Sequence, residues 1–348
     1  MNLLIADTIF PKGHKILNEH IIQLLSQRKD NIKVINYKKY YKDWSENNIR
    51  NYNLHYLFKC QNTYLDYLCQ IFNTAMLMFR LLTIRYDSII FFTFDTIAFS
   101  FLHFTFKKPI YLFHHNNTDH LQNKYKLLFF KTYMNHVNHI VFTDFIKNFL
   151  VNIGVNSDKI HVLSHPLSIN EKSVITNYKI KNNKEHIYIA LGHANDEELV
   201  QKIINYEINT HELENHKIKI IIRSIFEYKN LPHSLQIINY YLSQTEYEYY
   251  NQIADGVLIL YSESFQYRFS GALLDAFAHR KKVIGRNIPI VNYFKEKYPN
   301  NFTVFHEISD LIYKLSHLDN KFDENSYDSF LLSHSDETIK SQLNEILL

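Results

Sequence analysis

The stretch from residue 256 to residue 278 constrains the fold more than any other part of the chain. Residues 257–260 form a short apolar run, which is typical of a buried parallel strand. A polar loop follows, and residues 272–278 are then apolar on nearly every side, which predicts a buried helix. A buried strand that leads into a buried helix is the repeating unit of an α/β fold.

The same alternation continues through both halves of the chain. Strands are predicted at residues 2–6, 32–35, 88–92, 109–113, 139–142 and 160–163, and then at 187–191, 218–222, 235–238, 257–260, 282–284 and 303–305. Helical periodicity or capping signals separate most of these strands, whereas residues 37–52 are polar enough to be a loop. This rhythm predicts an α/β fold with two Rossmann-like, doubly wound domains that face each other across a cleft.

The polar stretch at residues 168–185 separates the two alternating regions. It lacks an apolar period, so it is expected to link a first domain, residues 1–167, to a second domain, residues 186–325. The last part of the chain, residues 326–348, is predicted to form a helix that packs back on the first domain. A long helical periodicity also covers residues 56–82.

Length, charge and cysteine content exclude several classes of protein. The chain has 348 residues, 46% of them hydrophobic, and a net charge of +3, which is too small to indicate a nucleic-acid binder. The first residues lack the basic and long apolar regions of a signal peptide, and Cys60 and Cys69 would lie on opposite faces of one helix. These features favour a cytoplasmic protein. Residues 88–106 are apolar, but Asp95 interrupts them, which favours a strand and a helix over a transmembrane span.

The turn before residue 272 has the features of a phosphate site. Ser270 is a good N-cap, and Gly271 permits close approach to the free N–H groups of the first helical turn. Arg268 supplies a nearby cation, and Asp275 follows Gly271 by roughly 6 Å along the helix axis. One helix is therefore able to hold the diphosphate and the ribose of a nucleotide. An ordinary buried helix with a capping serine explains the same residues about equally well.

Other candidate residues follow predicted strands, where doubly wound sheets bind their ligands. Gly192, Arg223 and Tyr261 end strands of the second domain. Arg223 is expected to pair with a diphosphate, with a surface arginine as the alternative. Lys229 is a candidate for an assisting cation, although a solvated lysine explains it better.

Several runs of residues give the chain a resemblance to a known enzyme family. In the second half these are Tyr-Glu-Tyr-Tyr-Asn-Gln-Ile-Ala-Asp-Gly-Val-Leu-Ile-Leu-Tyr at 247–261, Tyr-Arg-Phe-Ser-Gly-Ala-Leu-Leu-Asp-Ala-Phe-Ala at 267–278 and Lys-Lys-Val-Ile-Gly at 281–285. In the first half they are Ile-Tyr-Leu-Phe-His-His-Asn at 110–116 and Lys-Ile-His-Val-Leu-Ser-His-Pro at 159–166. In order and spacing the chain resembles glycosyltransferases of the GT-B type. Within them it is most similar to family 4, in the branch of bacterial polysaccharide, capsule and lipopolysaccharide gene products.

The resemblance implies a set of donor-binding residues. Similar enzymes often carry two acidic residues eight positions apart, and here the second matches Asp275 while the first position is occupied by Tyr267. Ser270, Gly271 and Arg268 lie between them and are expected to contact the diphosphate. The usual Gly-Arg and Lys after the first strand of the second half are replaced here, at residues 192–196, so the cation for the diphosphate must come from elsewhere.

The resemblance also implies roles for residues of the first half. In similar enzymes a histidine after a strand contacts the donor sugar or its phosphate, and His114 and His115 occupy this position. His115 is preferred because Asn116 follows it. Asp119 and His120 are candidates for orienting or deprotonating the acceptor, unless they simply begin a helix.

A short loop after the first strand completes the candidate residues. The glycine-rich loop of similar enzymes is reduced here to Pro-Lys-Gly-His, which leaves Gly13 and His14 on the acceptor side. Metal binding is not expected, because His161 and His165 fall on a predicted strand and its exit. There they would stand roughly 13 Å apart, too far to share one ion.

The chain is therefore predicted to be a glycosyltransferase that moves a hexose-like sugar from a nucleotide-diphosphate sugar to a glycan or lipid-linked acceptor. The nucleotide sugar is a co-substrate, and no cofactor and no nucleic acid are expected; retention of the anomeric configuration is implied by the resemblance alone. Residues 101–150 contain six lysines and two aspartates, and this excess of positive charge is suited to the anionic inner surface of a membrane. The alternative is that these lysines form a solvated helix face. The alternatives are a nucleotide-sugar 2-epimerase and a non-catalytic nucleotide-sugar-binding protein.

Overall fold

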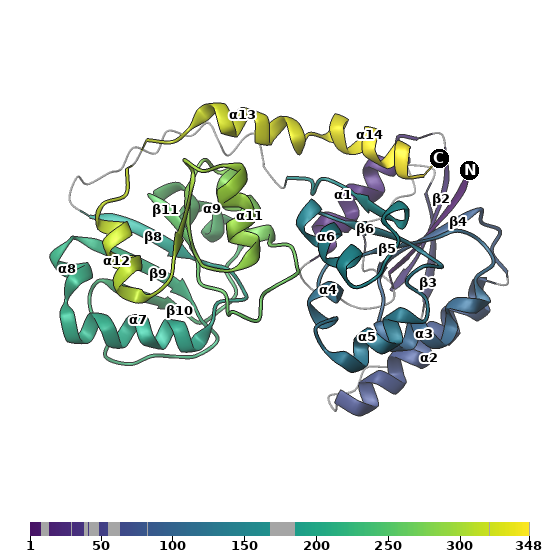
Figure 1. Cartoon of the computed structure of the whole chain (residues 1–348), viewed down its shortest axis with the longest axis horizontal. Coiled ribbons are helices and arrows are strands. Elements are labelled where there is room, and N and C mark those ends of the chain that lie inside the picture. Colours follow the sequence, from purple (N-terminus) through teal and green to yellow (C-terminus); the bar gives the residue numbers. More distant parts are fainter. Residues whose placement is uncertain are drawn as a thin grey trace. The chain divides into compact units, whose positions relative to one another are not determined.

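The chain folds into two compact units (Figure 1). Unit 1 comprises Met1–Pro166, Tyr267–Phe269 and Ser333–Leu348, and unit 2 comprises Leu167–Gln266 and Ser270–Leu332. The structure, a computed structural model, describes residues 1–7, 14–28, 30–37, 41, 49–54, 63–81, 83–167, 185–319 and 321–347. Most of the predicted linker, residues 168–184, lies outside these ranges, as do Gly13 and Cys60.

A seven-stranded parallel sheet forms the centre of unit 1. Its order is β3-β2-β1-β4-β5-β6-β7. The strands are β1 (Asn2–Asp7), β2 (Asn31–Tyr37), β3 (Ile49–Leu54), β4 (Ser88–Thr93), β5 (Ile110–Phe113), β6 (Asn138–Val141) and β7 (Ile160–Val162). The central strands β1 and β4 are buried almost throughout, as expected for parallel strands that are covered on both faces.

Helices cover both faces of the unit 1 sheet. They are α1 (Lys15–Ser26), α2 (Thr63–Leu81), α3 (Thr96–Leu102), α4 (Asn117–His120), α5 (Lys124–Lys131), α6 (Asp144–Asn152) and α14 (Asp336–Ile346), with single 3₁₀ turns η2 (His103–Thr105) and η3 (Ser157–Lys159). Side chains alternate along β1, so that Leu3 and Ile5 join one buried cluster with α1 and α14. Leu4 and Ala6 join the other cluster, with α2, α3, α5 and α6.

Unit 2 contains a second parallel sheet, with six strands in the order β10-β9-β8-β11-β12-β13. The strands are β8 (His186–Ala190), β9 (Ile218–Arg223), β10 (Leu235–Ile238), β11 (Gly256–Ile259), β12 (Lys282–Arg286) and β13 (Phe302–Phe305). The helices are α7 (Glu197–Thr210), α8 (Glu212–Asn215), α9 (Gln244–Ile253), α10 (Gly271–Ala278), α11 (Pro289–Lys297), α12 (Ile308–Ser316) and α13 (Glu324–Ser333). In both units the strand order reverses beside the first strand, so the predicted fold class of two doubly wound α/β domains is confirmed.

One prediction of secondary structure in the first half is wrong. The region 37–52, predicted as a loop, contains the beginning of β3, in which Ile49 pairs with Ile32 of β2. Because β3 is the edge strand, only part of it is buried, and its apolar pattern is too weak to recognise. Of the helix predicted at 56–82, residues 63–81 form α2, and residues 56–62 and 82 lie outside the described ranges.

The last helix of the chain belongs to unit 1. Its side chains Ile339, Leu343 and Ile346 are buried in the same cluster as α1. At its end Arg28 Nη1 donates hydrogen bonds to the carbonyl oxygen of Leu343 at 3.0 Å and to Asn344 Oδ1 at 2.7 Å. Across the described ranges, no helix has the length and apolar character needed to cross a membrane.

Candidate functional site

The candidate site of unit 2 lies where the strand order of its sheet reverses. From the neighbouring strands β8 and β11, the chain continues to β9 on one side and to β12 on the other. Open α/β sheets bind ligands at this point, outside the carboxyl ends of the strands. The segments after β8 and β11 meet there, because Asn195 and Tyr261 form an isolated backbone bridge. Asn195 Nδ2 also donates to the carbonyl oxygens of Ala190 at 2.7 Å and Arg223 at 2.8 Å.

Three candidate residues from separate parts of the chain come together at this edge. Tyr261 is buried, and its hydroxyl lies 2.9 Å from Ser270 Oγ. Gly192 lies against the Tyr261 ring, because a Cβ atom at position 192 would come within 3.1 Å of the ring carbon Cε1. This close approach favours glycine at position 192.

The start of α10 is open on the side where an anion would bind. Ser270 is buried and caps the helix, since its Oγ accepts from the Leu273 N–H at 3.1 Å. Gly271 is exposed, and a Cβ atom added there would meet no atom within 4 Å. The N–H groups of Gly271 and Ala272 have no hydrogen-bond acceptor in the described part of the chain, as is usual for a first helical turn. They are therefore available to an anion.

Arg223 lies at the end of β9 and is held by three neighbouring groups. Its Nε donates to the carbonyl oxygen of Tyr240 at 3.2 Å, and its guanidinium lies 4.5 Å from the ring centroid of Tyr241. Its Nη1 donates to Nδ1 of His193, which requires a neutral imidazole. Burial lowers the pKa of His193, and the charge of Arg223 lowers it further. Lys229 is exposed in the loop between β9 and β10.

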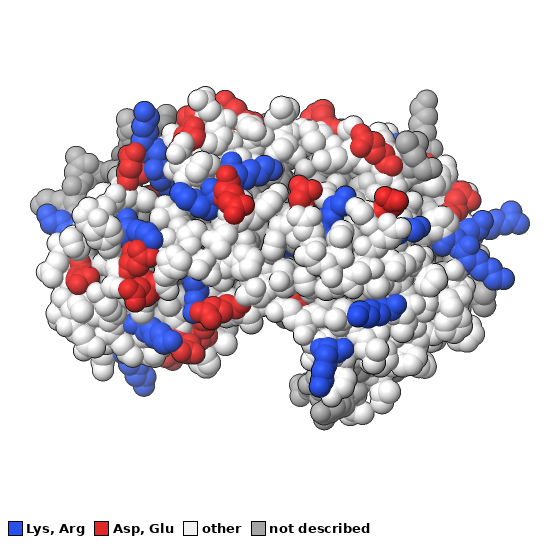
Figure 2. Space-filling model, viewed as in Figure 1, with Lys and Arg blue, Asp and Glu red and all other residues white. Residues whose placement is uncertain are grey.

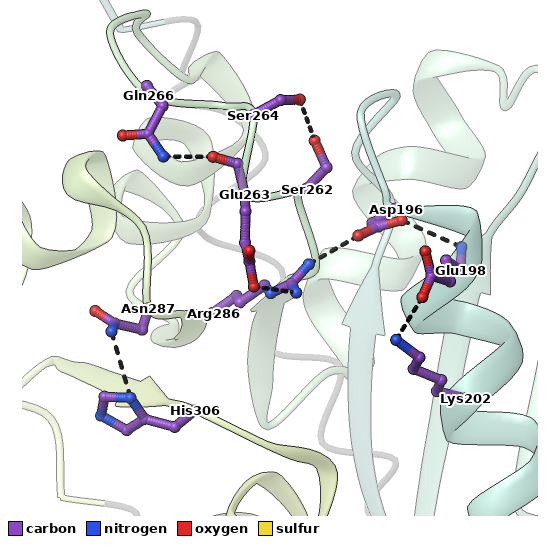
Figure 3. A network of polar contacts seen from close by, with 10 residues as sticks. All are labelled: Asp196, Glu198, Lys202, Ser262, Glu263, Ser264, Gln266, Arg286, Asn287 and His306. Carbon is purple, nitrogen blue, oxygen red and sulfur yellow. Dashed lines mark hydrogen bonds and ion pairs between the residues drawn. The ribbon is translucent and has the colours of Figure 1, made fainter.

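A second cation at this edge, Arg286 at the end of β12, was not among the residues predicted from the sequence. Figure 3 shows its guanidinium between two carboxylates, with Nη1 2.7 Å from Asp196 Oδ2 and Nη2 2.7 Å from Glu263 Oε1. Asp196 precedes α7 and Glu263 follows β11, so Arg286 joins the segments that leave β8 and β11. Its position at a strand end is the same signal that indicated Arg223.

Asp275 lies on α10, one helical turn after Gly271, and is partly buried. Burial raises the pKa of its carboxyl to about 6, His279 lowers this pKa, and the carboxylate of Glu248 raises it. Among the described residues no hydrogen-bond donor reaches the carboxylate of Asp275. A carboxylate in this environment is suited to accept hydrogen bonds from hydroxyl groups of a ligand.

In unit 1, His114 is part of a buried pair of histidines. Its Nε2 lies 2.8 Å from Nδ1 of His139, whose Nε2 lies 2.7 Å from the carbonyl oxygen of Met134. The carbonyl oxygen can only accept, so His139 carries its hydrogen on Nε2 and receives a hydrogen bond from His114. Burial lowers the pKa of His114 well below its usual value, and that of His139 to about 4. This arrangement ties His114 to the core of unit 1.

His115 points into a different group of rings. It stacks on His14 with ring centroids 4.2 Å apart, and Phe113 and Phe142 also lie against it. Its Nε2 is buried and has no hydrogen-bond partner within the described ranges. Burial lowers the pKa of His115 well below its usual value, and the charges of His14 and His165 would lower it further. A neutral imidazole with an unpaired nitrogen is suited to a hydrogen bond with a hydroxyl group.

Three of the predicted residues lie together in unit 1. Asp119 forms an ion pair with Arg268, with Oδ2 3.0 Å from Nε, and its Oδ1 accepts from the Tyr267 N–H at 2.8 Å. Tyr267 and Arg268 therefore contact α4, and the Arg268 charge is paired with a carboxylate.

Within the described ranges there is no group of three or more side chains that could hold a metal ion.

Comparison with solved structures identifies the type of fold. HepE of Anabaena in complex with UDP-glucose aligns over 100% of this chain and 99% of its own, with a TM-score of 0.70 and 12% sequence identity. The apo form of WaaB, a lipopolysaccharide outer core galactosyltransferase, aligns over 100% and 99%, with a TM-score of 0.64 and 14% identity. The UDP-GlcNAc 2-epimerase of Neisseria meningitidis, bound to UDP-GlcNAc, aligns over 100% and 99%, with a TM-score of 0.60 and 15% identity.

At the level of sequence the comparisons find no relative: no protein-family model matches the chain, and no curated protein matches it. The structural matches cover both units, and each unit has its own doubly wound sheet. The chain therefore has the two-domain GT-B fold, and the resemblance to this type is confirmed for the fold.

Proposed function

We propose that the protein is a glycosyltransferase that uses a nucleotide-diphosphate sugar as its donor. The open first turn of α10, with its unpaired N–H groups at Gly271 and Ala272, carries this proposal. Arg223, whose guanidinium contacts only neutral groups among the described residues, places positive charge at the carboxyl edge of the same sheet. Asp275 lies one turn further along α10 and is suited to bind the ribose. The solved structures of similar fold that hold UDP or UDP-glucose support this assignment.

In the proposed reaction the bond between the anomeric carbon and the diphosphate oxygen breaks, and the carbon forms a bond to an acceptor hydroxyl, which loses its proton. Negative charge develops on the leaving diphosphate. The N-terminus of α10 and Arg223 stabilise this charge, which lowers the barrier. Membership of family 4, transfer of a hexose and retention of configuration belong to the same proposal and rest on the sequence resemblance.

We further propose that the acceptor, a glycan or a lipid-linked molecule, lies at an anionic membrane. Unit 1 would bind the inner face of this membrane. The helices α2, α3 and α5 expose large apolar side chains, among them Phe72, Phe79, Phe101 and Leu128. Residues 96–131 contain five lysines, and the one acidic residue among them is Asp119, which is paired. The surface over α5 in Figure 2 carries basic side chains and no acidic ones. Apolar side chains beside lysines favour an anionic bilayer.

The donor site is tested by a thermal-shift and donor-hydrolysis screen with a panel of nucleotide sugars. One donor is expected to stabilise the wild-type protein, and Asp275→Ala or Arg223→Ala is expected to abolish that shift. Gly271→Leu is the sharper variant, because a side chain there enters open space without a clash but covers the N–H groups of the first turn. Its affinity for the donor should fall about tenfold or more, the equivalent of one hydrogen bond to a charged group.

Gln244→Leu is the matched control, because Gln244 is also the first residue of a helix capped by serine, α9. This variant should bind the donor like the wild type. Equal donor affinity in Gly271→Leu, Asp275→Ala and the wild type would refute the site. Product analysis then separates the alternatives: transfer supports the proposal, an epimerised donor supports a 2-epimerase, and binding without turnover supports a binding protein.

A further inference from the structure

Two ionisable side chains of unit 2 lie beside Asp275, the residue proposed to bind the ribose. His279 caps the end of α10 four residues after Asp275, so the two side chains lie on the same face of the helix. Glu248 belongs to α9. His279 Nε2 lies 3.1 Å from Glu248 Oε2, and the two side chains are 13% and 16% exposed. The pair thus links α10 to α9 within one compact unit.

The contacts of His279 indicate a charged ring. Its Nδ1 lies 2.7 Å from the carbonyl oxygen of Asp275, and its Nε2 faces the carboxylate of Glu248. A carbonyl oxygen and an ionised carboxylate can only accept hydrogen bonds, so both bonds form when both ring nitrogens carry hydrogen. The imidazole is then positively charged. The carbonyl groups at the end of a helix also favour a positive charge at this place.

The carboxylate of Asp275 has no hydrogen-bond donor among the described residues, although it is partly buried. Its ionisation therefore depends on the charges around it. Burial raises the pKa of Asp275, His279 lowers it, and the carboxylate of Glu248 raises it. Tyr247 of α9 also faces this carboxylate, and burial together with the charge of Asp275 raises the pKa of its phenol, which is therefore neutral. His279 thus supplies positive charge that offsets the burial of Asp275.

We propose that His279 is a positioning residue for donor binding: oriented by Glu248, it holds a positive charge beside Asp275 and keeps this carboxylate ionised for the hydroxyl groups of the donor ribose. An ionised carboxylate forms stronger hydrogen bonds to hydroxyl groups than the neutral acid does. This inference rests on the proposed function for its effect on donor binding. The ionisation of Asp275 itself is testable without a donor.

That ionisation is tested by NMR titration of the aspartate carboxyl carbons in the unliganded protein, with Asp275→Asn to assign the signal. The wild-type carboxyl should titrate with a midpoint near pH 6. His279→Gln removes a positive charge and should raise this midpoint by about 0.5 pH unit or more. Glu248→Gln removes a negative charge and should lower it, because the amide oxygen still accepts from His279 Nε2.

His317→Gln is the matched control for the titration. His317 also caps the end of a helix, α12, and its Nδ1 lies 2.9 Å from the carbonyl oxygen of Tyr313, four residues earlier. This variant should leave the midpoint of Asp275 unchanged. The proposal is overturned if His279→Gln also leaves the midpoint unchanged, or if His279→Gln and Glu248→Gln move it in the same direction. Either result would hold whether or not the protein binds a nucleotide sugar.

The effect on the site is tested by the affinity for UDP-glucose between about pH 5 and about pH 8, a range in which both phosphate groups of this probe stay ionised. In the wild type the affinity should fall as the pH decreases through about 6. In His279→Gln the fall should begin at a higher pH, while the affinity at about pH 8 stays within about twofold of the wild type. A purely structural role predicts weaker binding at about pH 8 and an unchanged midpoint, and that result would overturn the proposal. A wild type that binds no nucleotide sugar would count against the proposed function alone.

Discussion

Asp275 lies one helical turn after the open start of α10, and burial raises the pKa of its carboxyl to about 6. At neutral pH the carboxylate is ionised, but at a cost in stability, because burial disfavours the charged form. The folded state binds this proton more tightly than the unfolded chain does, so stability falls as the pH rises from about 4 to about 6. The cost is at most about 3 kcal/mol, since one pKa unit corresponds to about 1.4 kcal/mol.

Asp275→Asn should therefore stabilise the unliganded protein at pH 7.5 and have a much smaller effect near pH 4, where the carboxyl is neutral in the folded state and only about half ionised in the unfolded chain. The same variant should bind the donor more weakly, because the amide is a poorer acceptor for hydroxyl groups. Thermal unfolding at the two pH values, with and without donor, measures both effects. Asp144→Asn, at an exposed carboxylate of unit 1, serves as the control. A variant less stable than the wild type at pH 7.5 would show that the carboxylate has a structural partner.

Among the elements, α2 has an unusual distribution of side chains. Leu65, Leu68, Phe72, Met76 and Phe79 are between 44% and 68% exposed, and at about 100° per residue they lie within an arc of about 80°. The buried residues Leu77 and Leu81 lie on another side of the helix. An amphipathic helix of a globular protein normally turns its apolar stripe toward the core, whereas this stripe faces solvent. It is suited to the apolar boundary of a bilayer.

The protein should therefore co-sediment with vesicles that contain phosphatidylglycerol, and less with vesicles of phosphatidylcholine alone. A double variant, Leu68→Glu with Phe72→Glu, should lose binding by about tenfold or more, because each large apolar side chain contributes about 1.5–3 kcal/mol when buried. Added salt should weaken the attraction between the lysines and the anionic lipid. Ile208→Glu, at an exposed apolar position of α7 in unit 2, is the control. Equal sedimentation of the double variant would exclude α2 as the binding element.

At the scale of the whole molecule, the chain returns at its end to the unit in which it began. Ser333–Leu348 belong to unit 1, and α14 packs on α1 through a shared buried cluster. Leu343 is 1% exposed in this cluster. The first unit is therefore completed only by residues that follow the whole of the second sheet.

Leu343→Ala should lower the free energy of unfolding of unit 1 by about 2–4 kcal/mol, the usual cost of a cavity left by a buried leucine. Glu345→Ala, at an exposed position of the same helix, should change it by less than about 0.5 kcal/mol. Urea unfolding followed by circular dichroism measures both variants. Equal urea midpoints for Leu343→Ala and Glu345→Ala would show that the last helix has no part in the core of unit 1.

Local signals in the sequence were enough to predict most strands and the helix α10 with Ser270, Gly271 and Asp275 on it. Buried parallel strands are apolar over their whole length, and caps and glycines act on neighbouring residues, so these features depend on short stretches of chain. The edge strand β3 was missed for the same reason, because it is buried only in part.

The sequence by itself thus determined the two doubly wound sheets and the edges at which their ligands are expected. Only the tertiary structure decided which side chains meet there: Arg268 with Asp119, Arg286 with Asp196 and Glu263, and the stack of His115 on His14. These partners are tens to more than a hundred residues apart in the chain. An ion pair or a ring contact depends on positions set by the whole fold, and no short-range pattern of residue types records it.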